Sequence, residues 1–192
     1  MTNLNSITDS LAGRAAMLGG AAFAAAGITS LIHSQRHAGS RVIGLAGHLV
    51  LSLFVVALIS IAPSLIALAR RARPGIAQKA GPAAAAGTVL LGLATTTSVV
   101  NGRDLGLFTV VAPLTNAAWL FGSVIIAVSL KRAGSVPTAI AVGLPLTWVA
   151  TIPLSTFGGS LIGGAYFLTI GYLLANHAIE RQTNRIVAPA RA

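Results

Sequence analysis

Six long apolar runs divide this chain, and they restrict its possible folds more than any other feature. The runs cover residues 15–32, 42–69, 83–100, 107–130, 136–154 and 161–175. Most are about 18 residues or longer, enough helix to cross a hydrocarbon core about 30 Å thick. A backbone in lipid must satisfy its own hydrogen bonds, so these runs predict α-helices. We therefore expect an all-α membrane protein, a bundle of six transmembrane helices.

The composition supports the membrane class and excludes a nucleic-acid-binding one. Charged residues make up 8% of the chain and hydrophobic residues 55%, whereas a soluble domain carries about 25% charged residues. The net charge of +10 would suit nucleic acid. However, the basic residues form short clusters between the apolar runs, with no solvated basic face and no interleaved aromatic residues. Such clusters are typical of cytoplasmic helix ends.

The distribution of these basic residues predicts the orientation. Six spans with the N-terminus inside leave only Arg36, Arg41 and Arg103 on the outer side. Positive charge concentrates on the cytoplasmic side of membrane proteins, so we expect both termini in the cytoplasm. The cytoplasmic set is Arg14, Arg70, Arg71, Arg73, Lys79, Lys131, Arg132, Arg181, Arg185 and Arg191.

The chain divides into three parts on this pattern. Residues 1–13 are a polar segment in which Ser6, Thr8 and Asp9 can cap the following helix. Residues 14–180 form the transmembrane domain, and residues 181–192 form a basic C-terminal tail. Arginine far outnumbers lysine and alanine is abundant, a composition that we associate with bacteria. The expected location is therefore a bacterial cytoplasmic (inner) membrane.

Few side chains in the predicted spans suit catalysis. The acids Asp9, Asp104 and Glu180 all lie outside the apolar runs, and the chain contains no cysteine. Paired carboxylates, thiolate metal sites and cysteine nucleophiles are thus excluded. A serine hydrolase motif at Gly158-Gly159-Ser160 lacks its second glycine and an acid to orient a histidine. We expect no catalytic residue, no metal site and no cofactor.

The histidines leave one alternative open. His48 lies about 9 Å inside the outer end of the second run, and His33 ends the first run on the same side, with His37 just beyond. Such histidines could ligate a haem or a metal, as in a membrane enzyme or a redox protein acting on haem or quinone. The simpler interpretation, which we favour, is that His33 and His37 are solvated loop residues and that His48 forms a hydrogen bond to a neighbouring helix.

Polar side chains in the spans gather in their outer half. Candidate ligand-binding residues among them are His48, Thr95, Ser98, Asn116 and Thr147. One interpretation is a polar cavity that opens outward above a more apolar inner half. The other is that serine, threonine and glycine allow close helix contact, as at Gly159 and Gly163.

Asn116 is the one amide deep in a span, about 14 Å below the outer end of the fourth run. An unsatisfied amide in hydrocarbon costs several kcal/mol, so Asn116 should face the bundle and bond a neighbouring helix. Thr147 and Thr95 are the nearest candidates in depth, and Pro113 leaves a backbone carbonyl free that could also accept. Trp119 and Trp148 lie near mid-helix, so we expect them to pack inside the bundle; the alternative is that they line a pocket.

The juxtamembrane residues Arg70, Arg71, Arg73 and Lys79 should contact anionic lipid headgroups. Together with His48, the segment Leu68-Ala69-Arg70-Arg71 at the end of the second run resembles small polytopic bacterial membrane proteins. That resemblance implies no activity and no functional residue. We expect a non-catalytic carrier, ligand-binding protein or accessory component, which could associate with a membrane protein partner or with itself.

Overall fold

The computed structural model describes residues 4–33, 44–72 and 75–176. These residues form helices and no strand. The helices are α1 (Leu4–His33), α2 (Gly44–Arg71), α3 (Ile76–Asn101), α4 (Phe108–Ala133), α5 (Thr138–Thr151) and α6 (Gly159–Ala175), with a 3-10 turn at Ser155–Phe157. The expected all-α fold is confirmed.

Four of these helices are long and apolar enough to cross a membrane. They are α1, in its part Thr8–Ile32, then α2, α3 and α4. The other two are apolar but shorter, with 14 residues in α5 and 17 in α6. At about 1.5 Å per residue they are about 21 and 26 Å long, less than a hydrocarbon core of about 30 Å. Length alone therefore supports four spans rather than the expected six.

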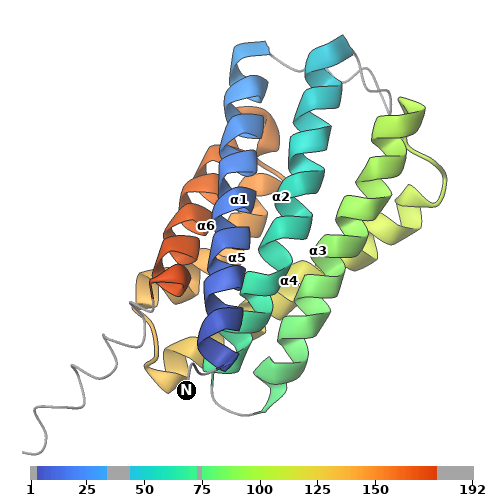
Figure 1. Ribbon diagram of the computed structural model, residues 1–192. Coiled ribbons are helices and arrows are strands. Elements are labelled where there is room, and N and C mark those ends of the chain that lie inside the picture. The colour runs from blue at the N-terminus through green and yellow to red at the C-terminus, as the bar shows by residue number, and fades with distance from the viewer. Residues whose placement is uncertain (1–3, 34–43, 73–74, 177–192) are drawn as a thin grey trace, which may run out of the picture.

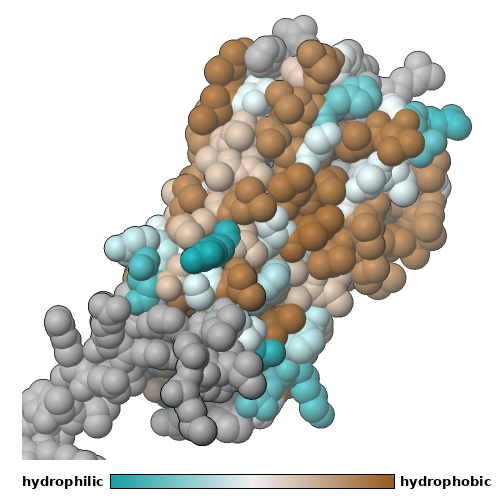
Figure 2. Space-filling view, viewed as in Figure 1, coloured by the Kyte–Doolittle hydropathy of each residue, from teal (hydrophilic) through white to brown (hydrophobic). Residues whose placement is uncertain are grey.

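The helices form a ring in which each packs beside the next in the chain and α6 returns to α1 (Figure 1). The interior is filled by large side chains that are fully buried, including Phe23, Leu58, Ile61, Leu65, Trp119, Ile126, Leu144 and Phe167. Apolar side chains also cover most of the outer face visible in Figure 2. Around the bundle as a whole, apolar side chains that are more than half exposed include Leu18, Leu90, Leu114, Phe121 and Ile162. An apolar exterior around an apolar core is what lipid as a solvent requires.

Glycines set the closest approach in this ring, between α1 and α6. On α1 they recur at Gly13, Gly20 and Gly27, a spacing of two helical turns that keeps them on one face. A Cβ atom at Gly20 would lie 2.6 Å from the backbone nitrogen of Leu168, and one at Gly171 would lie 2.6 Å from the carbonyl of Gly13. No side chain fits there, so the two backbones touch directly.

Glycines also lie at most of the other contacts between neighbouring helices of the ring. Gly19 lies between α1 and α2, Gly81 and Gly92 between α2 and α3, and Gly87 and Gly122 between α3 and α4. Gly159 and Gly163 face Ala150 and Thr151 of α5, which confirms the close contact expected of that pair. Among the described residues, the α4–α5 seam alone has no glycine whose nearest contacts lie across it.

Two helix starts differ from expectation because tertiary contacts extend them. Helix α1 begins at Leu4, so Ser6, Thr8 and Asp9 lie inside it and not before its first turn. Asp9 instead forms an ion pair of 2.8 Å with Arg71 at the end of α2. Helix α3 begins at Ile76, about two turns before the expected start at Ala83. Its first turns are buried against α2, where Gly81 contacts Ala69. The expectations for His37 and for the tail 181–192 fall outside the described residues.

Candidate functional site

The central polar contact of the bundle joins α4 to α5. The indole Nε1 of Trp148 donates a hydrogen bond of 2.9 Å to Oδ1 of Asn116, whose Nδ2 donates to the carbonyl of Ala112 at 2.8 Å. The expectation that Asn116 bonds a neighbouring helix is confirmed. Its partner, however, is neither Thr147 nor Thr95. A tryptophan donor reaches farther across a seam than a threonine hydroxyl.

The carbonyl that accepts from Asn116 also differs from the expected one. The missing N–H of Pro113 frees the carbonyl one turn earlier, at Thr109. Asn116 uses the carbonyl of Ala112 instead, because a side chain bonds most easily four residues back along its own helix.

Buried threonines at the candidate site are satisfied by their own helices. Thr95 donates to the carbonyl of Leu91 at 2.8 Å, and Thr147 donates to Leu144 at 2.6 Å. Thr88, Thr115 and Thr151 bond backward in the same way. A hydroxyl satisfied by its own helix presents mainly its methyl group to a neighbour. This arrangement supports the packing interpretation for the threonines over the cavity interpretation.

Five buried side-chain atoms have no hydrogen-bond partner among the described residues. Two lie at the ends of the bundle, Nη1 of Arg71 at the end of α2 and Oγ of Ser135 between α4 and α5. The other three lie within helices: Oγ of Ser98 on α3, and Nε1 of Trp119 and Oγ of Ser123 on α4. Trp119 and Ser123 are both fully buried, at 0% exposure. With Asn116 they are spaced three and four residues apart, which places all three on one face of α4. The sequence contained this signal, since its spacing can be read from the chain.

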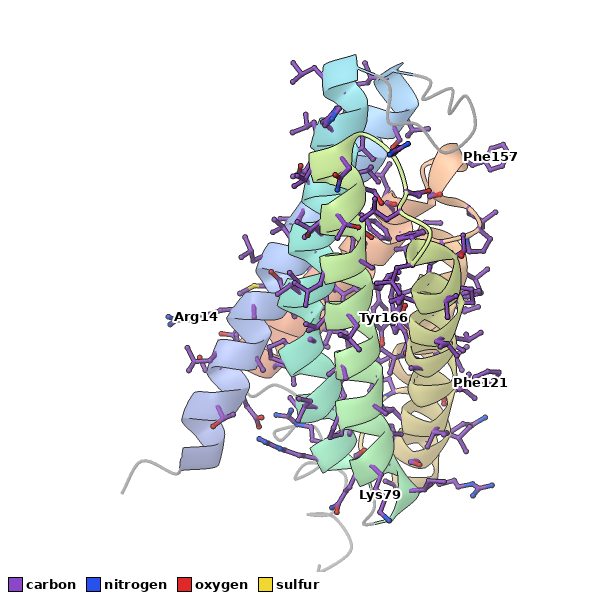
Figure 3. All side chains as sticks on the ribbon, turned by 90° about the vertical axis from the view of Figure 1, so that its right-hand side faces the viewer. Arg14, Lys79, Phe121, Phe157 and Tyr166 are labelled. Atoms are coloured by element: carbon purple, nitrogen blue, oxygen red, sulfur yellow. The ribbon has the colours of Figure 1, made fainter. Side chains whose placement is uncertain are left out.

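Tyr166 of α6 closes the seam between α5 and α6. Its hydroxyl donates to the carbonyl of Ile140 at 2.7 Å, and its ring lies over Gly143. Figure 3 shows Tyr166 at mid-height within the bundle, whereas Phe121 and Phe157 point outward. Tyr166 therefore links α5 and α6 through a backbone acceptor and is separate from the face of α4 that carries Asn116, Trp119 and Ser123.

His48 is the one histidine whose side chain lies in the described part of the chain. Nδ1 of His48 lies 2.9 Å from the carbonyl of Gly44 on its own helix. Among the described residues, no group of three His, Cys, Asp or Glu side chains could hold a metal ion. His33 ends α1, but its side chain falls outside the description, as does the whole of His37.

Basic residues gather at the end of the bundle where α1 begins and α2 ends. Arg70 and Lys79 are exposed there, and Figure 3 shows Lys79 projecting from this end. Arg71 is 11% exposed and paired with Asp9, so it serves the α1–α2 contact rather than a surface. Arg73 lies outside the described residues.

Comparison with known proteins adds no further constraint. No protein family, curated protein or solved structure matches this chain.

Proposed function

We propose that this chain is a multi-pass protein of the bacterial inner membrane with six spans and both ends in the cytoplasm. Within that membrane it acts as a non-catalytic component, either an accessory subunit, a binding protein or a small carrier. The observation that carries this proposal is the interior of the ring, where the buried threonines bond their own helices. The described residues place no acid there, since Asp9 pairs with Arg71 and Asp104 is exposed.

Six spans are supported by the position of α5 and α6 in the ring. Helix α6 packs along α1, which is itself long enough to span, and α5 packs between α4 and α6. A hairpin inserted between two spanning helices shares their surroundings, and a short helix is accommodated by local thinning of the bilayer. The excess of basic residues at one end supports a cytoplasmic location for that end.

Reporter fusions test the topology. A reporter active only in the cytoplasm should work after Lys79, Arg132 or Ala192, and should fail after Gly39 or Gly102. A periplasmic location for the Ala192 fusion, together with an N-terminus shown to be inside, would rule out an even number of spans. The Ala192 fusion thus distinguishes six spans from five.

Mass spectrometry of the protein purified in mild detergent tests the role. A copurifying protein in fixed ratio indicates an accessory subunit, and a copurifying small molecule indicates a binding protein or carrier. The exposed Arg70 and Lys79 should enrich anionic lipids in the same sample, and an Arg70→Gln, Lys79→Gln variant should lose that enrichment. Turnover of a substrate by the purified protein would contradict the non-catalytic role.

One observation favours a redox protein as a second candidate. The bond from Nδ1 of His48 to the Gly44 carbonyl leaves Nε2 as the lone-pair nitrogen of the neutral ring. A histidine that ligates haem iron or a metal is commonly held in this way. Optical absorption of the purified protein distinguishes the two candidates.

A further inference from the structure

The stripe of Asn116, Trp119 and Ser123 on α4 presents three polar side chains to the interior at helical spacing. Of these, Asn116 is satisfied by Ala112 and Trp148. The Nε1 of Trp119 and the Oγ of Ser123 have no partner among the described residues, although both side chains are fully buried. The two atoms belong to residues one helical turn apart, whose Cβ atoms are about 6 Å apart in an α-helix.

A donor buried without a partner is costly, and native proteins rarely tolerate one. The cost is about 1–3 kcal/mol for each neutral group, and more than nine in ten buried polar groups are paired. An indole nitrogen only donates, so its partner must offer an acceptor. Unlike Thr95 or Thr147, Ser123 does not donate to a carbonyl of its own helix.

We propose that Trp119 and Ser123 form an internal binding site for an uncharged hydrogen-bond acceptor, an oxygen that accepts from the indole N–H and exchanges a hydrogen bond with the serine hydroxyl. The oxygen belongs either to a buried water or to the carbonyl or hydroxyl of a small apolar molecule. An uncharged occupant follows from the surroundings, because the buried polar residues of the described interior are all serine or threonine. An ion there would have no counter-charge and would pay its full desolvation cost.

This site goes beyond the proposed function, since it holds for an accessory subunit as well as for a carrier. It uses none of the five candidate ligand-binding residues His48, Thr95, Ser98, Asn116 and Thr147 as a contact of the bound oxygen. The site lies on the side of α4 that carries the buried Ile126 and Leu130 one and two turns deeper.

Indole nuclear magnetic resonance tests the site directly, because the chain contains only two tryptophans. In protein with nitrogen-15-labelled indoles, Trp119→Phe and Trp148→Phe assign the two N–H resonances. We expect the Trp119 resonance to lie downfield, as for the hydrogen-bonded Trp148. Ser123→Ala should move it, and the control Ser129→Ala, on another face of the same helix, should leave it in place. A Trp119 resonance at the position of a free indole, or one that Ser123→Ala does not move, would overturn the proposal.

Two further measurements on the same sample distinguish a buried water from a small molecule as the source of the oxygen. A magnetisation-transfer peak between the Trp119 N–H and water, unchanged by exhaustive delipidation, identifies a buried water. Loss of the downfield shift when a small molecule is extracted into organic solvent, with its mass recovered, identifies a ligand. A shift that survives extraction without any water peak would contradict both sources and hence the site. Far-ultraviolet circular dichroism of each variant confirms that the helices remain.

Discussion

The indole N–H of Trp148 on α5 donates a 2.9 Å hydrogen bond to the side-chain carbonyl of Asn116 on α4. This bond lies in the one seam of the ring where no glycine of the described chain has its nearest contacts across the gap. The other neighbouring helices approach through glycine, whereas α4 and α5 are joined by a side-chain bond. We therefore expect the contact of α4 with α5 to depend on Asn116 and Trp148.

A double-mutant cycle at this bond should show a measurable coupling. Asn116→Leu and Trp148→Phe should each destabilise the protein in detergent, and their combined effect should be smaller than the sum. The expected coupling is about 0.6–1 kcal/mol, as for interhelical hydrogen bonds in membranes. Thermal or denaturant unfolding in detergent measures it. Strict additivity would mean that the bond contributes nothing to stability.

The same Asn116→Leu protein separates a structural role for this residue from a binding role. If Asn116 only joins two helices, molecules that copurify with the wild-type protein should still be bound. If it also lines a ligand site, the bound molecule should disappear while stability falls little. Mass spectrometry of the bound fraction, beside the unfolding curve, gives the answer, and we expect the first result because both polar atoms of the amide are already paired.

Gly164→Ala should destabilise the protein strongly for so small a change. The new Cβ atom would lie 2.7 Å from the backbone nitrogen of Ala24 and 2.7 Å from the carbonyl of Gly20, and backbone atoms cannot move aside. Overpacking of this kind costs about 1–3 kcal/mol. Gly106→Ala is the matched control, since its Cβ atom meets nothing within 4 Å. Equal melting temperatures for the two variants would contradict the direct contact of α1 with α6.

Breaking the ion pair between Asp9 and Arg71 should loosen the start of α1 from the end of α2. The side chains are 15% and 11% exposed. The loss in Asp9→Asn should therefore fall between about 1 kcal/mol for an exposed pair and about 3 kcal/mol for a buried one. The exchange Asp9→Arg with Arg71→Asp should recover part of it. An exchanged protein no more stable than the single variants would indicate that packing, not charge, holds these ends together.

Protein purified in mild detergent should show no Soret absorption. Among the described residues, His48 belongs to no group of three His, Cys, Asp or Glu side chains that could hold a metal ion, and His33 lies at the very end of α1. An absorption spectrum after growth with a haem precursor checks this expectation. A clear band that disappears in His48→Ala would contradict it and would favour the redox candidate instead.

The apolar runs by themselves determined the class of protein and the approximate helices. Membrane insertion depends on the hydropathy of each segment taken alone, so local composition was sufficient to place α2 and α4 to within a few residues. The same local signal did not predict where α1 and α3 begin, since both helices start before their apolar runs. Those starts depend on contacts with α2, such as the pairing of Asp9 with Arg71, 62 residues away in sequence.

Only the tertiary structure decided the partners of the polar side chains. Depth along the helices limited the candidates for Asn116 but could not select Trp148 over Thr147, its neighbour in sequence, because that choice depends on how α5 is rotated. Each threonine hydroxyl can donate either to a carbonyl of its own helix or to a neighbouring helix, and the sequence does not show which acceptor it uses. Trp119 had none, and its buried N–H became visible only when the ring closed around it. In lipid the hydrophobic effect does not order the helices among themselves, so close backbone contacts at glycines fix their rotation and thereby these polar pairings.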